Sequence, residues 1–427
     1  MEWIGRSCSW YKLWYRLTHR DENKNRGMAA TAAFGIETMN TRPLRVLAAA
    51  GIVAVGFCFV LGVYALSLTD KGATERDFIE YWAAGQLVVH NANPYDIGAI
   101  LRVEQAAGLD GNEPKVTLSP PFVLLLVLPL GFLGAKNALI LWLLLQLCCL
   151  LASILLIWRL MGSPPTGYQW IGVAFAPAVA CLMAGQISIF LLLGVVLFLR
   201  WHQSRPSLAG AVLLPCVLKP HLFLAVALVL LLWIAGTAAY RILAGSAVAL
   251  IAGFALTLCI DRHSWSEYAQ LSHSNRILQV FVPTLSCAFR FLVDYNAVWL
   301  QFLPAAASCV WAAWYFRSRR KCWNWMEHGL LVLLVAVLCA PYAFFYDEAI
   351  LLPAFLACIY RTADNRRSFL PLALVSVIAL IEASVEVPIT SRSYLWTTPA
   401  WLACYLYASR KKTLTPGNVR GAGEVFQ

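Results

Sequence analysis

The amino-acid sequence predicts an all-α integral membrane protein with about twelve membrane-spanning helices. Three observations predict this fold class. Hydrophobic residues make up 60% of the 427 residues and charged residues only 13%, whereas soluble domains carry about 25% charged residues. Apolar runs that approach the roughly 20 residues a helix needs to cross a bilayer recur almost to the C-terminus. Lysine and arginine stand in short clusters between these runs, as in cytoplasmic loops.

The expected spans come in pairs between the basic clusters, so both termini face the cytoplasm. We expect helices over residues 44–66, 136–160, 169–184, 187–201, 207–219, 221–240, 242–260, 297–316, 325–345, 347–361, 368–387 and 396–409. The chain then divides into an N-terminal arm (1–43), a transmembrane domain (44–409) and a cytoplasmic tail (410–427).

The arm mixes tryptophan and tyrosine with basic residues, which suits a helix on the anionic inner membrane surface. Translation that starts at Met28 or Met39 is the alternative, and the arm would then not be made.

Residues 118–133 are apolar but short, begin with two prolines and contain Pro129 near their end. Counting this segment as a span would reverse the side of every later basic cluster. We therefore expect a re-entrant or surface-lying helix here, covered by protein. It forms part of the first extracytoplasmic loop, 67–135, and residues 261–296 form the second. The stretch 67–117 holds eight acidic and four basic residues, so it is net acidic.

Ionisable groups at membrane depth are costly and therefore mark candidate functional sites. Lys219 lies in VLKPHLF, where Pro220 interrupts the helix between two short spans. An ammonium group with His221 beside a helix start suits an anion, so we predict that both residues bind a phosphate. The alternative is a lysine that extends to the membrane surface.

Asp77 lies in ERDFIEYWAAG, a few residues after the first expected span. Aromatic neighbours such as Tyr81 would partly desolvate this carboxylate and raise its pKa toward that of a useful general base. Glu80 would share a helical face with Asp77 and act as a supporting acid, and Tyr81 is a candidate substrate contact. The alternatives are a helix N-cap for Asp77 and a solvated acid for Glu80.

Further candidates lie at the outer ends of other spans. Arg290, in SCAFRFLV, is predicted to add a second phosphate contact, and Tyr346 with Asp347 is predicted to contact substrate. Gln186, in AGQISIF, is a candidate ligand contact. The alternatives are an interfacial arginine for Arg290, an aromatic belt with a helix N-cap for Tyr346 and Asp347, and a buried hydrogen-bonded amide for Gln186.

The sequence lacks the motifs of several other kinds of functional site. There is no GxxxxGK[ST] motif and no glycine-rich dinucleotide loop. The seven histidines are scattered and the cysteines lie mostly singly within apolar runs, so we expect no metal site and no cofactor. The basic clusters report membrane topology, and we expect no nucleic-acid partner.

The ordered motifs resemble glycosyltransferase family 87 over about residues 44–360. They are DFIEYWAAGQLVVHNANPYD, SPPFVLLLVLPLGFL, AGQISIFLLLG, RPSLAGAVLLPCVLKPHLF, SWSEY, LSCAFRFL and APYAFFYDEAILL. This family comprises bacterial enzymes of the GT-C superfamily that use polyprenyl-phosphate sugars, similar to mycobacterial mannosyltransferases. The sequence has Asp347-Glu348 where Asp-Leu is commoner, which leaves the role of that corner open.

The resemblance implies an inner-membrane enzyme that moves a sugar to an extracytoplasmic hydroxyl of a glycan or glycolipid. The identity of the sugar does not carry over from the family, so we expect a hexose or pentose, with mannose as the first guess. It implies that Asp77 is the base and that Lys219 lies near the lipid phosphate. The competing classes are a secondary transporter or lipid-linked-sugar flippase, in which Lys219 and Asp347 would be gating or coupling charges near mid-membrane, and a partner protein with the stretch 67–117 as its docking surface. Polar groups that gather at outer ends favour the enzyme, because a transporter needs them near mid-membrane.

Overall fold

The computed structural model describes residue 62 and residues 72–274, 280–363, 366–385 and 391–412. Within these ranges the chain folds into helices and turns without a β-strand, so the expected all-α architecture is confirmed there. The N-terminal arm and most of the first expected span, 44–66, lie outside the described residues.

Sixteen α-helices are labelled along this part of the chain. The earlier ones are α3 (Phe78–Val89), α4 (Ile97–Ala106), α5 (Leu124–Val127), α6 (Ala135–Leu160), α7 (Ala176–Ala184), α8 (Ser188–Trp201) and α9 (Pro206–Ala211). The later ones are α10 (Leu224–Thr237), α11 (Tyr240–Ile260), α12 (Ser264–Ser274), α13 (Leu285–Val293), α14 (Leu303–Arg319), α15 (Leu330–Leu338), α16 (Leu352–Thr362), α17 (Arg366–Ser384) and α18 (Thr397–Lys412).

Short 3₁₀ turns and one π-helical turn join or extend many of these helices. The 3₁₀ turns are η1 (Pro121–Val123), η2 (Leu128–Phe132), η3 (Tyr168–Ala174), η4 (Leu214–Leu218), η5 (Pro220–Leu222), η7 (Val298–Phe302), η8 (Arg320–Cys322), η10 (Phe345–Leu351) and η11 (Arg392–Trp396), and η9 (Trp325–Gly329) is a π-helix. Prolines explain many of the junctions, because a proline lacks the amide hydrogen that an uninterrupted helix requires.

Several expected spans are therefore not single helices, which corrects the sequence prediction. The expected span 207–219 consists of α9 and the turn η4, which contains Pro215. The expected span 221–240 becomes η5 and α10, with Pro220 at the start. Of the described helices, α6 and α11 alone are long and apolar enough to cross a bilayer unaided, so the full count of twelve spans stays a prediction.

Large apolar side chains nevertheless cover the outside of the bundle. On α11, Val248 and Ile251 are 67% and 69% exposed, and Val310 on α14 is 73% exposed. A soluble protein rarely leaves such contiguous apolar faces in water, whereas lipid would cover them at no cost. These faces, together with α6 and α11, indicate a membrane protein.

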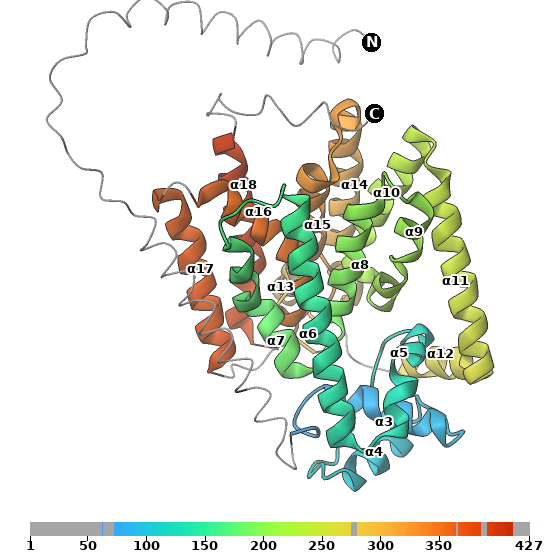
Figure 1. Cartoon of the computed structure of the whole chain (residues 1–427). Coiled ribbons are helices and arrows are strands. Elements are labelled where there is room, and N and C mark those ends of the chain that lie inside the picture. Colours follow the sequence, from blue (N-terminus) through green and yellow to red (C-terminus); the bar gives the residue numbers. More distant parts are fainter. Residues whose placement is uncertain (1–61, 63–71, 275–279, 364–365, 386–390, 413–427) are drawn as a thin grey trace, which may run out of the picture. The chain divides into compact units, whose positions relative to one another are not determined.

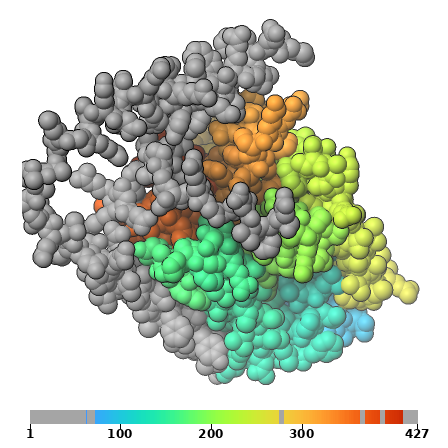
Figure 2. Space-filling model, turned by 45° about the horizontal axis from the view of Figure 1, so that its top comes forward, coloured from blue at the N-terminus to red at the C-terminus, as the bar shows by residue number. Residues whose placement is uncertain are grey.

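One end of the bundle gathers α3, α4, α5 and α12, as Figure 1 shows. In the space-filling view, α11 and α12 form the yellow margin of the molecule and adjoin the cyan and blue residues that include α5 (Figure 2). The last turns of α6, α8 and α14 contain arginines and lie toward the opposite end (Figure 1). The basic ends of these three helices thus lie at one end of the bundle, whereas their membrane side stays a prediction.

The proline-flanked segment 118–133 is covered by protein. It forms η1, α5 and η2, and Val123, Leu124 and Val127 are fully buried. Gly85 on α3 and Gly131 on η2 let the two backbones touch, since a Cβ on Gly131 would lie 2.2 Å from the Gly85 carbonyl oxygen. The segment is thus an interrupted helix that fixes α3 at the end of the bundle, and its re-entrant or surface-lying position in the membrane stays a prediction.

Candidate active site

The turn that ends α7 positions the start of α3. Gly185 adopts a left-handed conformation (φ +70°), which glycine reaches without the Cβ penalty of other residues. A Cβ on Gly185 would lie 2.6 Å from the Cβ of Phe78. The Gly185 carbonyl also accepts a hydrogen bond from the Trp142 indole (2.7 Å). Because Phe78 is the first residue of α3, this contact fixes the position of Asp77 immediately before it.

Gln186, the next residue, joins the carboxyl groups of Asp77 and Glu80. Its side chain is 4% exposed, and its amide nitrogen donates to Asp77 Oδ2 (3.0 Å) and to Glu80 Oε1 (3.4 Å). Its Oε1 accepts from the Tyr81 hydroxyl (2.8 Å). Asp77 precedes the helix but makes no side-chain cap bond. Its carboxylate is therefore directed to the site rather than to the helix N-terminus.

Lys219 lies on the other side of Gln186. Its ammonium donates to Gln186 Oε1 (3.3 Å) and forms an ion pair with Asp347 Oδ1 (2.6 Å). The lysine is 6% exposed and the aspartate is fully buried. The ammonium also lies 4.9 Å from the centre of the Tyr346 ring. Burial of this charge is thus offset by a carboxylate, an amide and an aromatic face.

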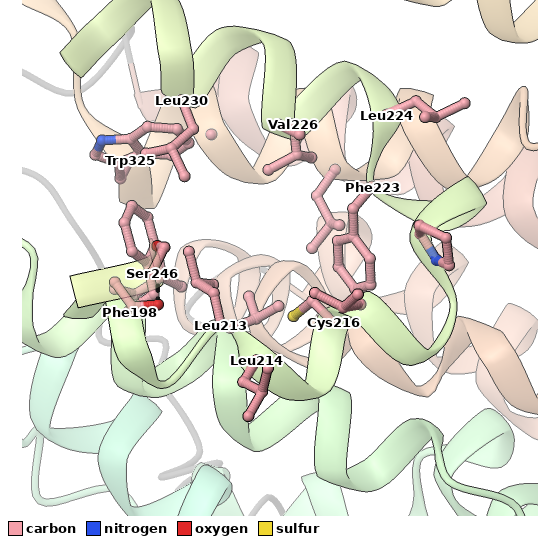
Figure 3. A pocket seen from close by; sticks show the side chains of 18 of the residues that line it. Phe198, Leu213, Leu214, Cys216, Phe223, Leu224, Val226, Leu230, Ser246 and Trp325 are labelled. Atoms are coloured by element: carbon pink, nitrogen blue, oxygen red, sulfur yellow. Dashed lines mark hydrogen bonds between the residues drawn. The ribbon is translucent and has the colours of Figure 1, made fainter. Parts of the chain in front are cut away.

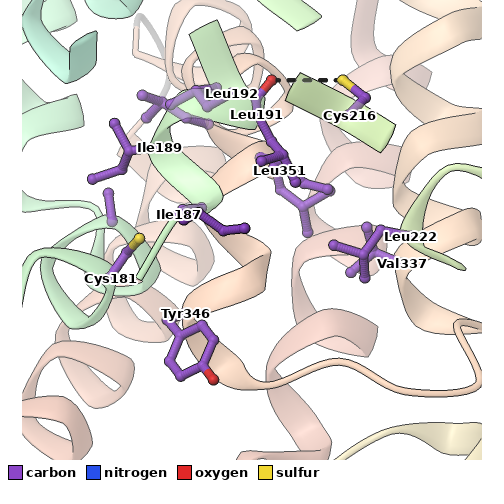
Figure 4. Packing of buried hydrophobic residues seen from close by; sticks show 14 of the residues in the cluster. Cys181, Ile187, Ile189, Leu191, Leu192, Cys216, Leu222, Val337, Tyr346 and Leu351 are labelled. Atoms are coloured by element: carbon purple, nitrogen blue, oxygen red, sulfur yellow. Dashed lines mark hydrogen bonds between the residues drawn. The ribbon is translucent and has the colours of Figure 1, made fainter. Parts of the chain in front are cut away.

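Asp347 receives further hydrogen bonds that hold it in place. The Ser188 hydroxyl donates to Oδ1 (2.6 Å), and the Phe344 backbone amide donates to Oδ2 (3.0 Å). Tyr346 beside it is almost completely buried and packs near Cys181 and Ile187 (Figure 4). In that view its hydroxyl points away from the labelled apolar residues. The turn η10 thus carries both residues into the cluster.

His221 lies at the edge of this cluster. Its ring centre is 4.8 Å from that of Tyr342, with the two planes tilted by 55°. Its Nε2 atom is buried and has no hydrogen-bond partner among the residues that the structure describes. A ligand atom would satisfy this nitrogen, because a buried polar atom is costly when left alone.

The Glu80 carboxyl group of α3 has a raised pKa. Burial, followed by the charge of Asp77, raises the pKa of Glu80 from 4.5 to about 8. Burial likewise raises the pKa of Tyr81 well above 10. At neutral pH Glu80 is therefore mostly protonated, and it relieves the repulsion that a second negative charge would impose on Asp77.

The sequence-predicted residues thus largely gather in one place, which we call the polar cluster. Its members are Asp77, Glu80, Tyr81, Gln186, Lys219, His221, Tyr346 and Asp347. Sequence reasoning missed Ser188 and Tyr342. An isolated hydroxyl two residues after Gln186 in an apolar run was the available signal for Ser188, and the aromatic stretch before Asp347 was the signal for Tyr342.

Arg290 contacts a different set of residues. It is 1% exposed, and its guanidinium donates to Gln301 Oε1 (2.7 Å) and lies over the rings of Phe291 and Tyr295. Gln301 in turn donates to the Pro341 carbonyl. The guanidinium thus reaches the chain segment before Tyr342 through Gln301, and its role in phosphate binding stays a prediction.

Glu348, next to Asp347, turns the opposite way. Its carboxyl group accepts from Thr397 (2.6 Å), Thr398 (2.7 Å) and the Trp401 indole (2.9 Å). These bonds fasten η10 to the start of α18. The two adjacent acids therefore have different roles. Asp347 belongs to the polar cluster, whereas Glu348 holds η10 against α18.

Metal ligands are not grouped in the part of the chain that the structure describes. No three His, Cys, Asp or Glu side chains there lie close enough together to hold a metal ion. The arrangement at the polar cluster is instead a carboxylate next to a protonated carboxyl group, with an ammonium group across a shared amide. Such a set can remove a proton and can hold an anion.

The helical bundle, its apolar exterior and its polar cluster define a membrane protein with a candidate catalytic centre. The sequence model of glycosyltransferase family 87 matches residues 118–341, more than half of the chain, and the chain belongs to this family. No curated protein and no solved structure matches the chain. The protein is thus a glycosyltransferase, which requires a sugar donor and an acceptor.

The matched region covers only part of the polar cluster. Gln186, Lys219 and His221 lie within residues 118–341, whereas Asp77 precedes that range and Asp347 follows it. The spatial contacts are what connect these outlying residues to the matched region. Membership of the family favours the enzyme over the transporter and the partner protein.

Proposed function

We propose that this glycosyltransferase moves a sugar from a polyprenyl-phosphate sugar to an acceptor hydroxyl on the extracytoplasmic side of the bacterial inner membrane. Mannose is the first candidate sugar, and a glycan or glycolipid is the candidate acceptor. The observation that carries the proposal is the Asp77 carboxylate, which shares Gln186 with the buried ammonium of Lys219. A base and an anion-binding group thus lie on either side of one side chain.

An apolar pocket beside Lys219 supports a lipid-linked donor. Its volume is about 290 Å³, and it lies between α8, α10, α11 and α15 (Figure 3). Val217, Pro220 and Phe223, which flank Lys219 in the chain, are among its lining residues. A polyprenyl chain in this pocket would bring its phosphate toward the polar cluster, because both are adjacent to the same turn.

Lys219 and His221 are the proposed phosphate contacts. An ammonium group has three N–H donors, and the hydrogen bonds to Asp347 and Gln186 use two of them. The third remains for a phosphate oxygen. Because Asp347 offsets the positive charge, we expect Lys219 to orient the phosphate more than to neutralise it, and the Nε2 atom of His221 adds a second hydrogen bond.

The proposed reaction is a single displacement at the anomeric carbon. Asp77 removes the proton of the acceptor hydroxyl, and the oxygen forms a bond to the anomeric carbon as the bond from that carbon to the phosphate oxygen breaks. The electron pair leaves with the polyprenyl phosphate, which departs as an anion and needs no general acid. One displacement inverts the configuration. Metal independence is part of the proposal.

Replacement of Asp77 by asparagine tests the proposed base. Asp77→Asn keeps the shape and the hydrogen bond from Gln186 but removes the basicity, so we expect transfer to fall by about 10²- to 10⁴-fold. The measurement is release of polyprenyl phosphate from labelled polyprenyl-phosphate-mannose by the purified full-length protein. Glu113→Gln, an exposed acid of the same outer segment, is the matched control. An Asp77→Asn protein that folds and transfers at the wild-type rate would remove Asp77 from this role.

A further inference from the structure

An aromatic row follows α15 and leads into the polar cluster. Tyr342 and Phe344 lie in the segment that connects α15 to η10, and Tyr346 is the second residue of η10. The ring centres of Tyr342 and Phe344 are 5.4 Å apart, and those of Phe344 and Tyr346 are 5.3 Å apart. The row begins at the His221 ring and ends below the Lys219 ammonium. It therefore lies along the groups proposed to hold the phosphate.

The members of this row differ in exposure. Tyr346 is buried and serves the core, whereas Tyr342 and Phe344 are only half-buried. Within the described part of the chain, the Tyr342 hydroxyl makes no hydrogen bond. A half-buried tyrosine whose hydroxyl has no partner in the described protein can offer a ligand both ring surface and a hydrogen bond.

The surroundings of Tyr342 are polar on one side. Asp77, Glu80 and Asp347 lie close enough for their charges to act on its hydroxyl, and Tyr81 is also nearby. An aromatic ring whose hydroxyl end lies near carboxyl groups suits a pyranose ring. The C–H groups of the sugar carry partial positive charge and stack on the π face, while its hydroxyl groups bond to the carboxyl groups.

The segment that carries these rings is fixed from both sides. The Ser286 hydroxyl donates to the Cys339 carbonyl (2.9 Å), and Gln301 donates to the Pro341 carbonyl. The Phe344 amide donates to Asp347 (3.0 Å). Such anchoring holds the rings ready before a ligand arrives, which reduces the entropy cost of binding.

We propose that the Tyr342 ring is a stacking platform for the pyranose ring of a sugar substrate, and that Phe344, whose plane is turned by 77° from that of Tyr342, borders this platform. This inference rests on the proposed function and deepens it, because it assigns the site of the sugar itself. The ring belongs to the donor or to a sugar acceptor, and both sources present the same chemistry to the platform.

Binding measurements with three probes test the platform. The probes are polyprenyl-phosphate-mannose, polyprenyl phosphate without a sugar, and methyl α-mannopyranoside, each titrated into the purified full-length protein. If the donor sugar occupies the platform, Tyr342→Ala weakens binding of the first probe about tenfold and leaves the second unchanged. If an acceptor sugar occupies it, the loss is confined to methyl α-mannopyranoside. Tyr342→Phe keeps the ring and should retain most of the affinity in either case.

Tyr240→Ala is the matched control, because Tyr240 is an exposed tyrosine at the start of α11. Unchanged binding of all three probes by Tyr342→Ala would overturn the platform, as would equal weakening of the two lipids. Both results leave wild-type binding and transfer intact, so they count against the platform alone. A wild-type protein that binds none of the probes counts against the proposed function, and the platform falls with it.

Discussion

The side chain of Gln186 uses both ends of its amide. The nitrogen faces Asp77 and Glu80, and the oxygen accepts from Tyr81 and Lys219. This arrangement admits one orientation of the amide, because carboxylates need donors and an ammonium needs an acceptor. Gln186 therefore orients the candidate base, and a direct contact with substrate stays a prediction.

Protonation of Glu80 should determine the alkaline limit of activity. Its pKa is raised to about 8 by burial and by Asp77, so above that pH a second negative charge appears beside Asp77 and the incoming phosphate. We expect transfer by the wild-type protein to fall about tenfold per pH unit above pH 8. In Glu80→Gln this fall should be absent, which a pH–rate profile of kcat/KM would show.

The raised pKa of Glu80 also predicts the direction in which the stability of the fold changes with pH. Between pH 4.5 and about 8 the folded protein keeps a proton that the unfolded chain has released, so rising pH destabilises the fold in this window. Thermal unfolding of Glu80→Gln should lose that part of the slope. If kcat/KM of Glu80→Gln still falls above pH 8 as it does in the wild-type protein, a group other than Glu80 causes the alkaline fall in activity.

The pair formed by Lys219 and Asp347 limits how mutants can be interpreted. Removal of one partner leaves a buried charge alone, which typically costs about 3–5 kcal/mol. Loss of activity in a Lys219 variant is therefore no evidence of phosphate binding unless folding is measured as well. The Asp77 variant has no such ambiguity, because Asp77 forms no ion pair with the residues that the structure describes.

At the level of elements, the sequence predicted where helices occur more accurately than where they are interrupted. The expected span 136–160 is α6, 187–201 is α8 and 242–260 is α11, each within a few residues. The spans that divided contain prolines such as Pro215 and Pro220, whose breaking effect was visible in the sequence. A hydrophobicity count does not reveal whether a break yields a 3₁₀ turn or two separate helices, since tertiary packing decides this.

The turn at Gly185 offers a test of how elements position the site. In Gly185→Ala, the new Cβ meets Phe78 and the residue must adopt a left-handed conformation. We expect a loss of stability of about 1–3 kcal/mol. Displacement of α3 should also lower transfer at least tenfold, because Asp77 precedes that helix directly. Thermal unfolding and the transfer assay measure the two effects.

Gly167→Ala is the control that separates the effect of backbone strain from that of the contact with Phe78. Gly167 has nearly the same φ (+71°), but a Cβ on this residue would meet no atom within 4 Å. The variant should therefore lose stability through strain while transfer by the folded protein stays near the wild-type rate. Equal activity losses in the two variants would show that the Phe78 contact does not position Asp77.

At the level of the whole molecule, the site is assembled from segments far apart in the chain. Asp77 and Glu80 could be paired from sequence, because three residues on a helix place them on one face. The pair between Lys219 and Asp347 spans 128 residues, and no local pattern specifies such a contact. Residue type and position at span ends identified the candidates, and the fold then supplied their partners.

The opposite ends of the bundle yield a prediction about the membrane itself. The polar cluster lies with α3, and the arginine-ended helices point the other way (Figure 1), so the two ends should face different compartments. Cys322 is exposed and follows the basic end of α14. In spheroplasts that produce a variant in which Cys322 is the one cysteine retained, a membrane-impermeant maleimide should label the protein only after permeabilisation, and the additional change Cys322→Ser should remove that signal. Asn112→Cys, in the exposed outer segment, should react without permeabilisation. Labelling of Cys322 from outside would reverse the topology and place the proposed reaction in the cytoplasm.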